Sequence, residues 1–549
     1  MFVFVCFRLS SIFSRQTDGI QRDIYTGSNI DNQDSNVHEY TRVKPSDYLQ
    51  YGNPVLVSDV LPGFQKVDHA QDLWIYSVFY EYKNPATELP GIRAIGMISV
   101  KHTRFDATEH STFHLTFPNG KTSSVGGREE KLRFDGRWSE CDVEYANVVL
   151  ECDLPSGVHP DHVAFSWSDN STWSHSFQVT YPDLSRKRTL TMCYGVLYGG
   201  FSDHDAVLQN IEYNRLMGVE HFYIYNQSVG AGVEAVFQFY IQQGFLTVLQ
   251  MPNEIPAKFS WYHGQQVSIQ DCHTRNRYTS TYVIVQDTDE FIMSSLHSSF
   301  TEVIEFVEKN LTDLIEKNEK ETSFFLSFLR PSFPNVLNLV EKNFVKKQIE
   351  SDVFQVHPKG KRWTTPQAVH DDIAGFSFQH AYFSRLPASR TELQHRKDMF
   401  GMSGEDYKFA DDTGIRIIKE TKHAKFLEFG QKQKMIIRPD LVILHGTHNT
   451  YSRKSNTVEL RVNHSVAFLA HHSMKDIDVK PELYFHPRPF YKRYLDIIRR
   501  RREAFVNFVT MYNVKLNKGR ELRIPKKALG ETWNKLNVEE IKDLKKRQG

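Results

Sequence analysis

The sequence predicts an α/β protein in which a mixed sheet with crossover helices follows a small β-sandwich. Between residues 186 and 286, short apolar runs alternate with segments of helical periodicity, which is typical of parallel strands joined by helices. Between residues 51 and 185, β-branched and aromatic runs follow one another without helical segments, which favours a β-sandwich. At 549 residues, the chain exceeds what one hydrophobic core usually organises.

The individual elements follow from these patterns. In the β-rich part we expect strands at 73–80, 94–100, 113–117 and 177–180. In the alternating part we expect strands at 191–198, 222–225, 246–249 and 282–285, with helices at 205–217, 233–243 and 265–278. Gly218 can end the first of these helices.

The two ends of the chain differ from the middle. Residues 1–50 combine a short apolar segment with a polar stem. The apolar run is interrupted by Arg8 and falls short of the ~20 residues of a spanning helix, so it is interpreted either as the remnant of a signal or anchor or as an imperfectly predicted start. Residues 481–549 form a basic helical extension. Its run Arg499–Arg502 indicates a solvated helix face or, less favoured, a surface for an acidic partner or membrane.

Charge and cysteine content narrow the function classes. Lys and Arg number 67 against 66 Asp and Glu, so no global field attracts nucleic acid, and no nucleic-acid partner is predicted. Leaving Cys6 aside, four cysteines are compatible with Cys141–Cys152 and Cys193–Cys272 disulfides in an oxidising compartment. Buried free thiols explain the same residues equally well.

The segment Asp287-Thr288-Asp289-Glu290 directly follows the apolar strand expected at 282–285. Ligands of open α/β sheets bind beyond the carboxyl ends of the strands. Two carboxylates at this spacing suit Mn²⁺ or Mg²⁺, which could bridge the phosphates of a nucleotide sugar. The alternative is a solvated acidic loop or the cap of a following helix.

Several separated segments together resemble glycosyltransferase family 92, a set of galactosyltransferase-like proteins with the nucleotide-diphospho-sugar (GT-A) fold. The segments are Cys193–Gly199, Asn210–Tyr213, Leu216–Asn226, His263–Gln265, Gln270–Cys272, Asp287–Phe291, Lys434–His445 and Ala470–Ser473. Their order and separation make the combination specific although each motif is weak. The resemblance makes residues 186–480 a GT-A-like catalytic domain, behind a β-rich domain at 51–185.

The resemblance implies a metal-dependent hexosyltransferase. It implies UDP-galactose as donor, Mn²⁺ or possibly Mg²⁺ as cofactor, a glycan or glycoprotein acceptor, and inversion at the anomeric carbon. It also implies anchoring in the Golgi or another secretory-pathway membrane, with a luminal catalytic domain.

The same resemblance assigns roles to individual residues. Asp289 is expected to bind the metal, Asp287 to contact the donor ribose or a metal-bound water, and His445 to be a third protein ligand. Glu290 either orients these groups or caps the next element. Asp271 faces the donor or makes a structural bond. No general base is identified.

Two positions depart from the family pattern. Asn210 stands where relatives usually have Trp, and Ser473 stands where an Arg is expected, so a contact to the donor phosphates is expected to be absent. A non-catalytic glycan-binding protein that keeps the GT-A scaffold is therefore the alternative function. A glycosidase is disfavoured, because it needs an acid and a base flanking the bond rather than a chelating pair.

Overall fold

The described part of the chain covers most of the two predicted folded regions. The computed structural model describes residues 61–68, 72–100, 112–126, 128–131, 143–166, 175–254, 256–294, 296–313, 354–356, 371–384, 403–420, 422–474, 482–483 and 488–516. The apolar segment and polar stem expected at 1–50 lie outside these residues, as do Cys6 and Cys141.

Two antiparallel sheets form the N-terminal part. The first has the strand order β1-β2-β3-β7-β6 and the second β5-β4-β8-β9. One hydrophobic core contains residues of both sheets, among them Val78, Ile92, Phe113 and Val163. The predicted strands are present as β2, β3, β4 and β9, with shifted ends. The bounds are β1 Gln65–Asp68, β2 Leu73–Glu81, β3 Gly91–Ser99, β4 Thr112–Thr116, β5 Thr122–Gly126, β6 Arg128–Lys131, β7 Tyr145–Asp153, β8 His162–Ser166 and β9 Ser176–Gln178.

An eight-stranded mixed sheet follows, with the order β12-β11-β10-β13-β19-β16-β22-β15. Strands β12, β11, β10 and β13 are mutually parallel, and β19 pairs antiparallel to β13. The four expected strands and three expected helices of this region are all present. The bounds are β10 Arg188–Leu197, α2 His204–Leu216, β11 His221–Asn226, α3 Ala231–Ile241, β12 Leu246–Gln250, α4 Gln265–Asn276, β13 Ser280–Gln286, β15 Phe354–Val356, β16 Ile373–Phe378, β19 Lys434–Ile437 and β22 Val458–Val462.

The ends of helix α2 show how local sequence sets these boundaries. The Asp203 carboxylate accepts a hydrogen bond of 2.9 Å from the Ala206 backbone N–H at the start, which satisfies one orphan donor. At the other end Gly218 has a φ of 103°, a conformation that glycine adopts without steric penalty.

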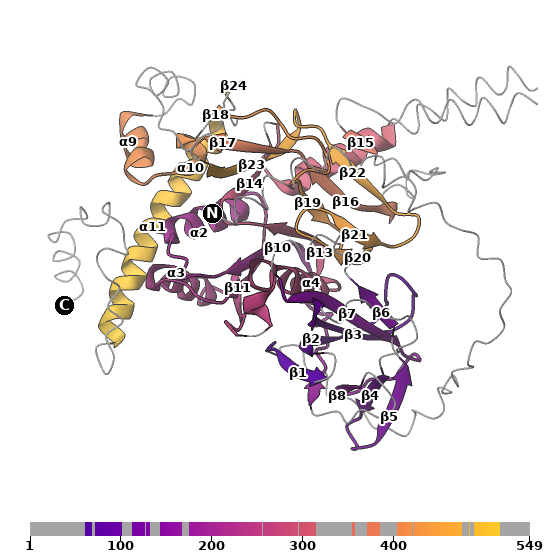
Figure 1. Cartoon of the computed structure of the whole chain (residues 1–549). Coiled ribbons are helices and arrows are strands. Elements are labelled where there is room, and N and C mark those ends of the chain that lie inside the picture. Colours follow the sequence, from indigo (N-terminus) through magenta and orange to yellow (C-terminus); the bar gives the residue numbers. More distant parts are fainter. Residues whose placement is uncertain are drawn as a thin grey trace, which may run out of the picture.

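Another sheet, ordered β14-β23-β17-β18-β24, lies beside the eight-stranded one (Figure 1). Three residues separate the end of β13 from the start of β14, so the acidic segment forms the turn between the two sheets and ends in the first residue of β14. The bounds are β14 Glu290–Ser294, β17 His380–Ser384, β18 Lys422–His423, β23 Ala467–Met474 and β24 Glu482–Leu483; the remaining elements are α9 Gly404–Asp412, α10 Arg416–Lys419, β20 Val442–His445, β21 Thr450–Arg453 and α11 Arg488–Leu516.

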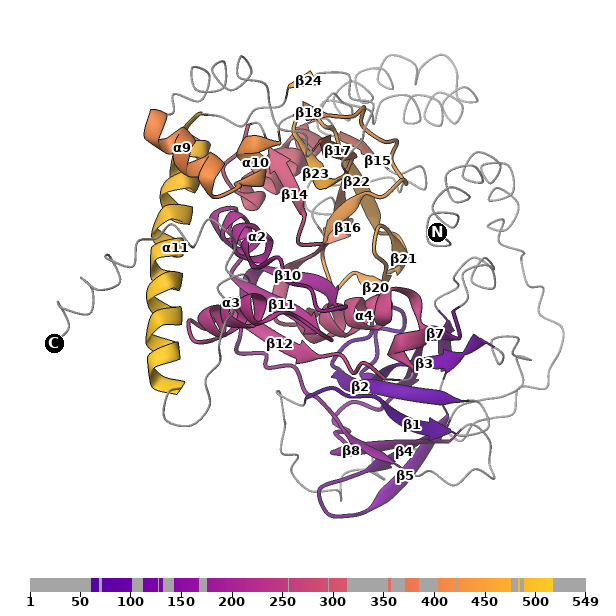
Figure 2. The ribbon, with the colours of Figure 1, turned by 60° about the vertical axis from the view of Figure 1, so that its left-hand side comes forward.

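The long helix α11 runs along α2 and α3 (Figure 2) and joins the core of the central sheet through residues such as Tyr494 and Phe505. Three of its arginines form ion pairs with neighbouring elements: Arg499 with Asp406, Arg501 with Glu212 and Arg502 with Asp205. Within the described residues, part of this basic run therefore forms intramolecular ion pairs and is not simply a solvated helix face.

Helix α4 lies between the central sheet and the first N-terminal sheet, and a third core cluster joins all three. Two buried ion pairs sit at this junction. Arg93 pairs with Glu151 and donates to the Ile443 carbonyl at 2.6 Å. Arg277 pairs with Glu81 and donates to the Val442 carbonyl at 3.0 Å. The N-terminal sheets therefore hold the segment that leads from β19 into β20.

A search of the described residues for a helix long and apolar enough to cross a membrane finds none.

Candidate functional site

The acidic turn is closed by its own hydrogen bonds. The Glu290 backbone N–H donates to the Asp287 carbonyl at 3.2 Å, and the Asp287 N–H donates to Glu290 Oε2 at 3.0 Å. The side chains of Asp287 and Asp289 are 39% and 27% exposed, whereas that of Glu290 is 2% exposed. Two carboxylates therefore face solvent while the third is held beneath them.

Lys434, the first residue of β19, lies under this turn. Its Nζ is 3.1 Å from Asp287 Oδ2 and 3.2 Å from Glu290 Oε2, and its side chain is fully buried. Burial lowers the pKa of the Lys434 ammonium, but the charges of Asp287 and Glu290 outweigh burial and raise that pKa above its ordinary value. The ammonium is thus a fixed positive charge inside the site.

Burial raises the pKa of Glu290, and the charges of Asp287 and Asp289 add to the effect, while Lys434 opposes it. Such a carboxylate needs a counter-ion in order to stay ionised away from water. Sequence reasoning included Lys434 in a family motif but gave it no role, because nothing local indicated that β19 would pair beside β13.

Two histidines complete the cluster. Strand β23 pairs with β14 so that His471 stands opposite Glu290. His471 Nε2 is 3.5 Å from Asp289 Oδ2, and its Nδ1 is 2.9 Å from His380 Nε2. Burial lowers the pKa of His471, but the hydrogen bond that its ring donates to Asp289 and the charges of Glu290 and Asp289 raise it above its ordinary value. Burial and the neighbouring His471 lower the pKa of His380.

These residues fit a divalent cation. Among the described residues, potential ligand atoms of Glu290, His380 and His471 all lie within 4.8 Å of one another. The other ring nitrogen of His380, Nδ1, is buried without a hydrogen-bond partner. One carboxylate oxygen and two imidazole nitrogens suit transition metals such as Mn²⁺ or Zn²⁺, and Asp289 is close enough to His471 to join them.

Gly195 in β10 gives the carboxylates room. A Cβ at this position would lie 3.2 Å from Gln265 Nε2 and 3.4 Å from Asp287 Oδ1. Beside it, Tyr262 and His263 adopt positive φ values of 43° and 55°, a strained conformation that is concentrated at functional sites. The Tyr198 ring lies 4.2 Å from the His263 ring. Burial, followed by the charge of Asp287, raises the pKa of Tyr198, which places this aromatic wall beside the carboxylates.

Asn210 has a structural role in this chain. Its Nδ2 donates to the Glu290 carbonyl at 2.7 Å, and its Oδ1 accepts from the Tyr194 hydroxyl at 2.7 Å. Helix α2 therefore supports the start of β14 from behind. Ser473, the other departure, lies in β23, and its side chain is outside the described part.

Two other predicted residues, His445 and Asp271, do not belong to the group of potential ligand atoms found in the described part of the chain. His445 ends β20 with a buried side chain, and its ring is 6.4 Å from that of His273; it is not in the ligand group found among the described residues. Burial, followed by the charge of Lys434, lowers the pKa of His445 to about 3. Its role as a metal ligand stays a prediction, whereas His471 and His380 were not predicted as ligands.

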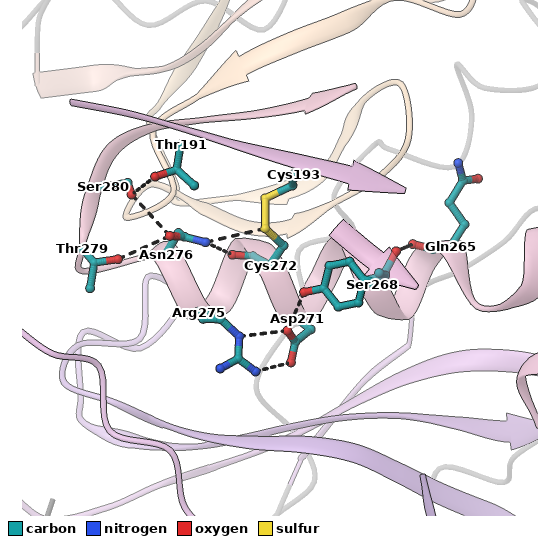
Figure 3. The surroundings of a disulfide bond; sticks show 11 residues. Thr191, Cys193, Gln265, Ser268, Asp271, Cys272, Arg275, Asn276, Thr279 and Ser280 are labelled. Carbon is teal, nitrogen blue, oxygen red and sulfur yellow. Dashed lines mark hydrogen bonds and ion pairs between the residues drawn. A yellow bond between two sulfur atoms is a disulfide. The ribbon is translucent and has the colours of Figure 1, made fainter. Parts of the chain in front are cut away.

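Asp271 lies on α4 toward the N-terminal sheets (Figure 3). Its two oxygens accept from Arg275 at 3.1 Å each, and Oδ2 also accepts from the Tyr225 hydroxyl at 2.5 Å. These contacts match the structural bond that was one of the two interpretations of this residue, and a donor contact stays untested.

The cysteine pairing is confirmed for one of its two predicted bonds. A disulfide joins Cys193 of β10 to Cys272 of α4, with the Cα atoms 6.1 Å apart (Figure 3). Cys152 is buried, and its predicted partner Cys141 lies outside the described residues, so the second pairing stays a prediction.

Comparisons with known proteins address the family. Residues 188–334 match the model of glycosyltransferase family 92. The chain is 25% identical over 169 residues to Beta-1,4-galactosyltransferase galt-1 of Caenorhabditis elegans. That match covers 28% of this chain and 40% of the relative's own length. A solved structure of a Ferredoxin-NADP+ reductase mutant from Plasmodium falciparum matches at 11% identity over 38% of this chain and 84% of its own, with a TM-score of 0.11.

The fold is a mixed α/β arrangement that fits a glycosyltransferase-like protein, and the carboxylate turn lies within the matched residues. The resemblance is therefore confirmed for the motifs between Cys193 and Phe291: over residues 188–334 this chain is a match to glycosyltransferase family 92.

Proposed function

We propose that this protein is a glycosyltransferase that moves a hexose, galactose in our proposal, from a UDP-sugar onto a glycan acceptor, with inversion, at the cluster around Asp287, Asp289 and Glu290. The supporting observation is the convergence of that turn with Lys434 and His471 at the carboxyl end of a central parallel strand. Ligands of open α/β sheets bind at this end. The parallel order β12-β11-β10-β13 supports the finer proposal of a GT-A fold behind a β-sandwich.

A divalent cation, Mn²⁺ in our proposal, would be held by Asp289 together with His471, His380 or Glu290. Bound there, it would offset the charge that develops on a departing diphosphate. Asp287 is the most exposed carboxylate of the turn, which makes it available to a ribose hydroxyl or a metal-bound water. His445 becomes the weaker candidate ligand, because His380 and His471 already offer two imidazole nitrogens beside Glu290.

The chain's own residues divide two tasks. Lys434 opposes the rise in the pKa of the buried Glu290 and fixes one oxygen of Asp287. The aromatic wall of Tyr198, Tyr262 and His263 stands beside Asp287 and would exclude water from one side of a bound sugar nucleotide. A charged group placed where the leaving group develops its charge contributes most when it is held rigidly in advance.

The disulfide between Cys193 and Cys272 supports a place in the secretory pathway, because such bonds persist in oxidising compartments. We therefore propose a luminal site of action in the Golgi or another secretory compartment. No specific observation favours the non-catalytic alternative.

The test is a panel of UDP-sugars incubated with the full chain and Mn²⁺, in which release of UDP and transfer to glycan acceptors are measured. We expect UDP-galactose to be turned over and Asp289→Asn to lose at least about 100-fold, as for removal of a group that stabilises transition-state charge. Asp440→Asn, which changes a half-exposed carboxylate paired with Arg438, is the matched control and should remain active. Equal turnover by wild type and Asp289→Asn would exclude the proposed site.

A further inference from the structure

A second pocket lies at the opposite end of β13 from the carboxylates, between the N-terminal sheets and the central sheet. Thr279, which precedes β13, lines it together with Phe79 of β2 and Thr247 of β12. The seven residues of β13 lie between Thr279 and Asp287, which places the two residues about 26 Å apart at the rise of a β-strand. This pocket is therefore distinct from the acidic turn.

Three arginines line this pocket, and they differ in how their charges are balanced. Arg186 Nε is 3.2 Å from Asp183 Oδ2, and Arg275 binds both oxygens of Asp271 (Figure 3). Arg188, at the start of β10, has no carboxylate within ion-pair distance among the described residues. The pocket thus contains two neutralised guanidinium groups and one whose charge is uncompensated.

The remaining lining combines hydroxyl groups with apolar surface. Thr180, Thr247 and Thr279 supply hydroxyls. Leu61, Tyr223 and Leu249 supply carbon surface, and of these three Leu61 is the largely exposed one. Thr247 Oγ1 is fixed by a 2.9 Å hydrogen bond with His221 Nε2, and the Arg275 guanidinium stacks 5.1 Å from the Phe79 ring centroid. These groups are held in place before any ligand arrives, which reduces the entropy lost on binding.

We propose that this pocket binds an acidic sugar, with its carboxylate or sulfate group on Arg188 and its ring against the exposed side chain of Leu61. A guanidinium forms paired hydrogen bonds with planar oxyanions. A pyranose ring offers hydroxyl groups to threonine side chains and C–H surface to apolar ones. Because the pocket is remote from the acidic turn, it would be an accessory glycan site. One part of a polysaccharide or glycoprotein glycan would bind in the pocket while another part of the same glycan lies elsewhere on the protein.

The experiment measures binding of four probes to the full chain by calorimetry and ligand-observed NMR, without any sugar nucleotide. The probes are glucuronic acid, N-acetylglucosamine 6-sulfate, neutral N-acetylglucosamine and inorganic sulfate. We expect one or both acidic sugars to bind more tightly than the neutral sugar and than inorganic sulfate. Binding by the uronate or by the sulfated sugar then distinguishes the two sources of the anion.

Variants assign the binding to the pocket. Arg188→Gln should weaken binding of the acidic sugar by about tenfold or more, the effect of losing a charge-assisted hydrogen bond. Arg188→Lys should retain part of the affinity, which also shows that the position tolerates change. Arg500→Gln on the exposed side of α11 removes one charge elsewhere and should leave binding unchanged.

Three outcomes overturn the proposal: no binding of either acidic sugar, equal binding of inorganic sulfate, or equal affinities of wild type and a folded Arg188→Gln. The assay involves no transfer reaction, so its result is independent of whether the acidic turn is a glycosyltransferase site. Conversely, binding of acidic sugars to this pocket without any release of UDP in the transfer assay would support the pocket proposal and contradict the proposed glycosyltransferase function.

Discussion

Replacement of Lys434 by Met is the change whose effect can be worked out most fully from the structure. The Lys434 ammonium is buried between Glu290, which is 2% exposed, and Asp287, which is 39% exposed. Asp287 can turn toward water when the lysine is lost, so its share of the loss is small. Glu290 cannot, and a buried charge without its partner destabilises a protein by about 3–5 kcal/mol.

The effect depends on pH in a defined direction. In Lys434→Met, Glu290 loses the one charge that lowers its pKa most strongly, so the folded-state pKa rises further above the unfolded value. The unfolded chain releases this proton at lower pH than the folded chain does, so stability is lost as the pH rises from the unfolded pKa up through the folded pKa. The destabilisation by Lys434→Met should therefore be larger at pH 8 than at pH 5.

The assay is urea unfolding of wild type, Lys434→Met, Glu290→Gln and the double variant at both pH values. A neutral glutamine no longer needs the ammonium, so the double variant should recover about 2–3 kcal/mol relative to the sum of the single changes. Lys454→Met, which breaks a pair with Glu88 at the surface, should change stability by no more than about 1 kcal/mol. Additive single effects, or a loss that is equal at both pH values, would refute this reasoning.

Three further predictions concern the scaffold. Cys272→Ser removes a crosslink between residues 79 positions apart and should destabilise the protein by about 4 kcal/mol in the chain-entropy model; dithiothreitol should produce a similar loss in wild type and none in the variant. Asn210→Ala removes one of two side-chain donors to the Glu290 carbonyl, the other being Gln286, and takes away the acceptor of the buried Tyr194 hydroxyl. It should lower the free energy of unfolding by about 1–3 kcal/mol, whereas an unchanged midpoint in urea would contradict that support. Burial, then the charge of Arg188, lowers the pKa of His221 to about 3. At pH 5 the unfolded chain therefore binds a proton at His221 that the folded chain does not bind. This difference should lower the free energy of unfolding at pH 5 by about 2 kcal/mol. His221→Asn should remove that part of the acid destabilisation in unfolding curves at pH 7.5 and pH 5, and an unaltered pH dependence would count against it.

The sequence was most informative where chemistry is local. Alternating apolar runs and helical periodicity predicted every strand and helix from β10 to β13, because each of these elements buries one face or stripe of its own sequence. The place of the acidic turn at the carboxyl end of the apolar strand β13 could likewise be predicted, whereas its role as a site stays a prediction. The Cys193–Cys272 bond was one of two pairings compatible with the composition.

What the sequence could not supply was the pairing of distant strands. His380 and His471 meet only because β17 and β23 are neighbours in the sheet that contains β14. Lys434 reaches the turn only because β19 pairs with β13, although Lys434 lies 147 residues after Asp287 in the sequence. Neither contact leaves a periodic or short-range signal. The order of strands after β14 likewise could not be predicted, because loops of varied length separate them.

The most direct test of the central claim is binding of Mn²⁺ to the full chain, followed by electron paramagnetic resonance in the presence of UDP. The account predicts that Asp289→Asn and His471→Gln each weaken Mn²⁺ binding by at least about tenfold, while His445→Gln changes it less. Binding that survives both substitutions at the turn, but is abolished by His445→Gln, would contradict the account and move the metal away from the cluster.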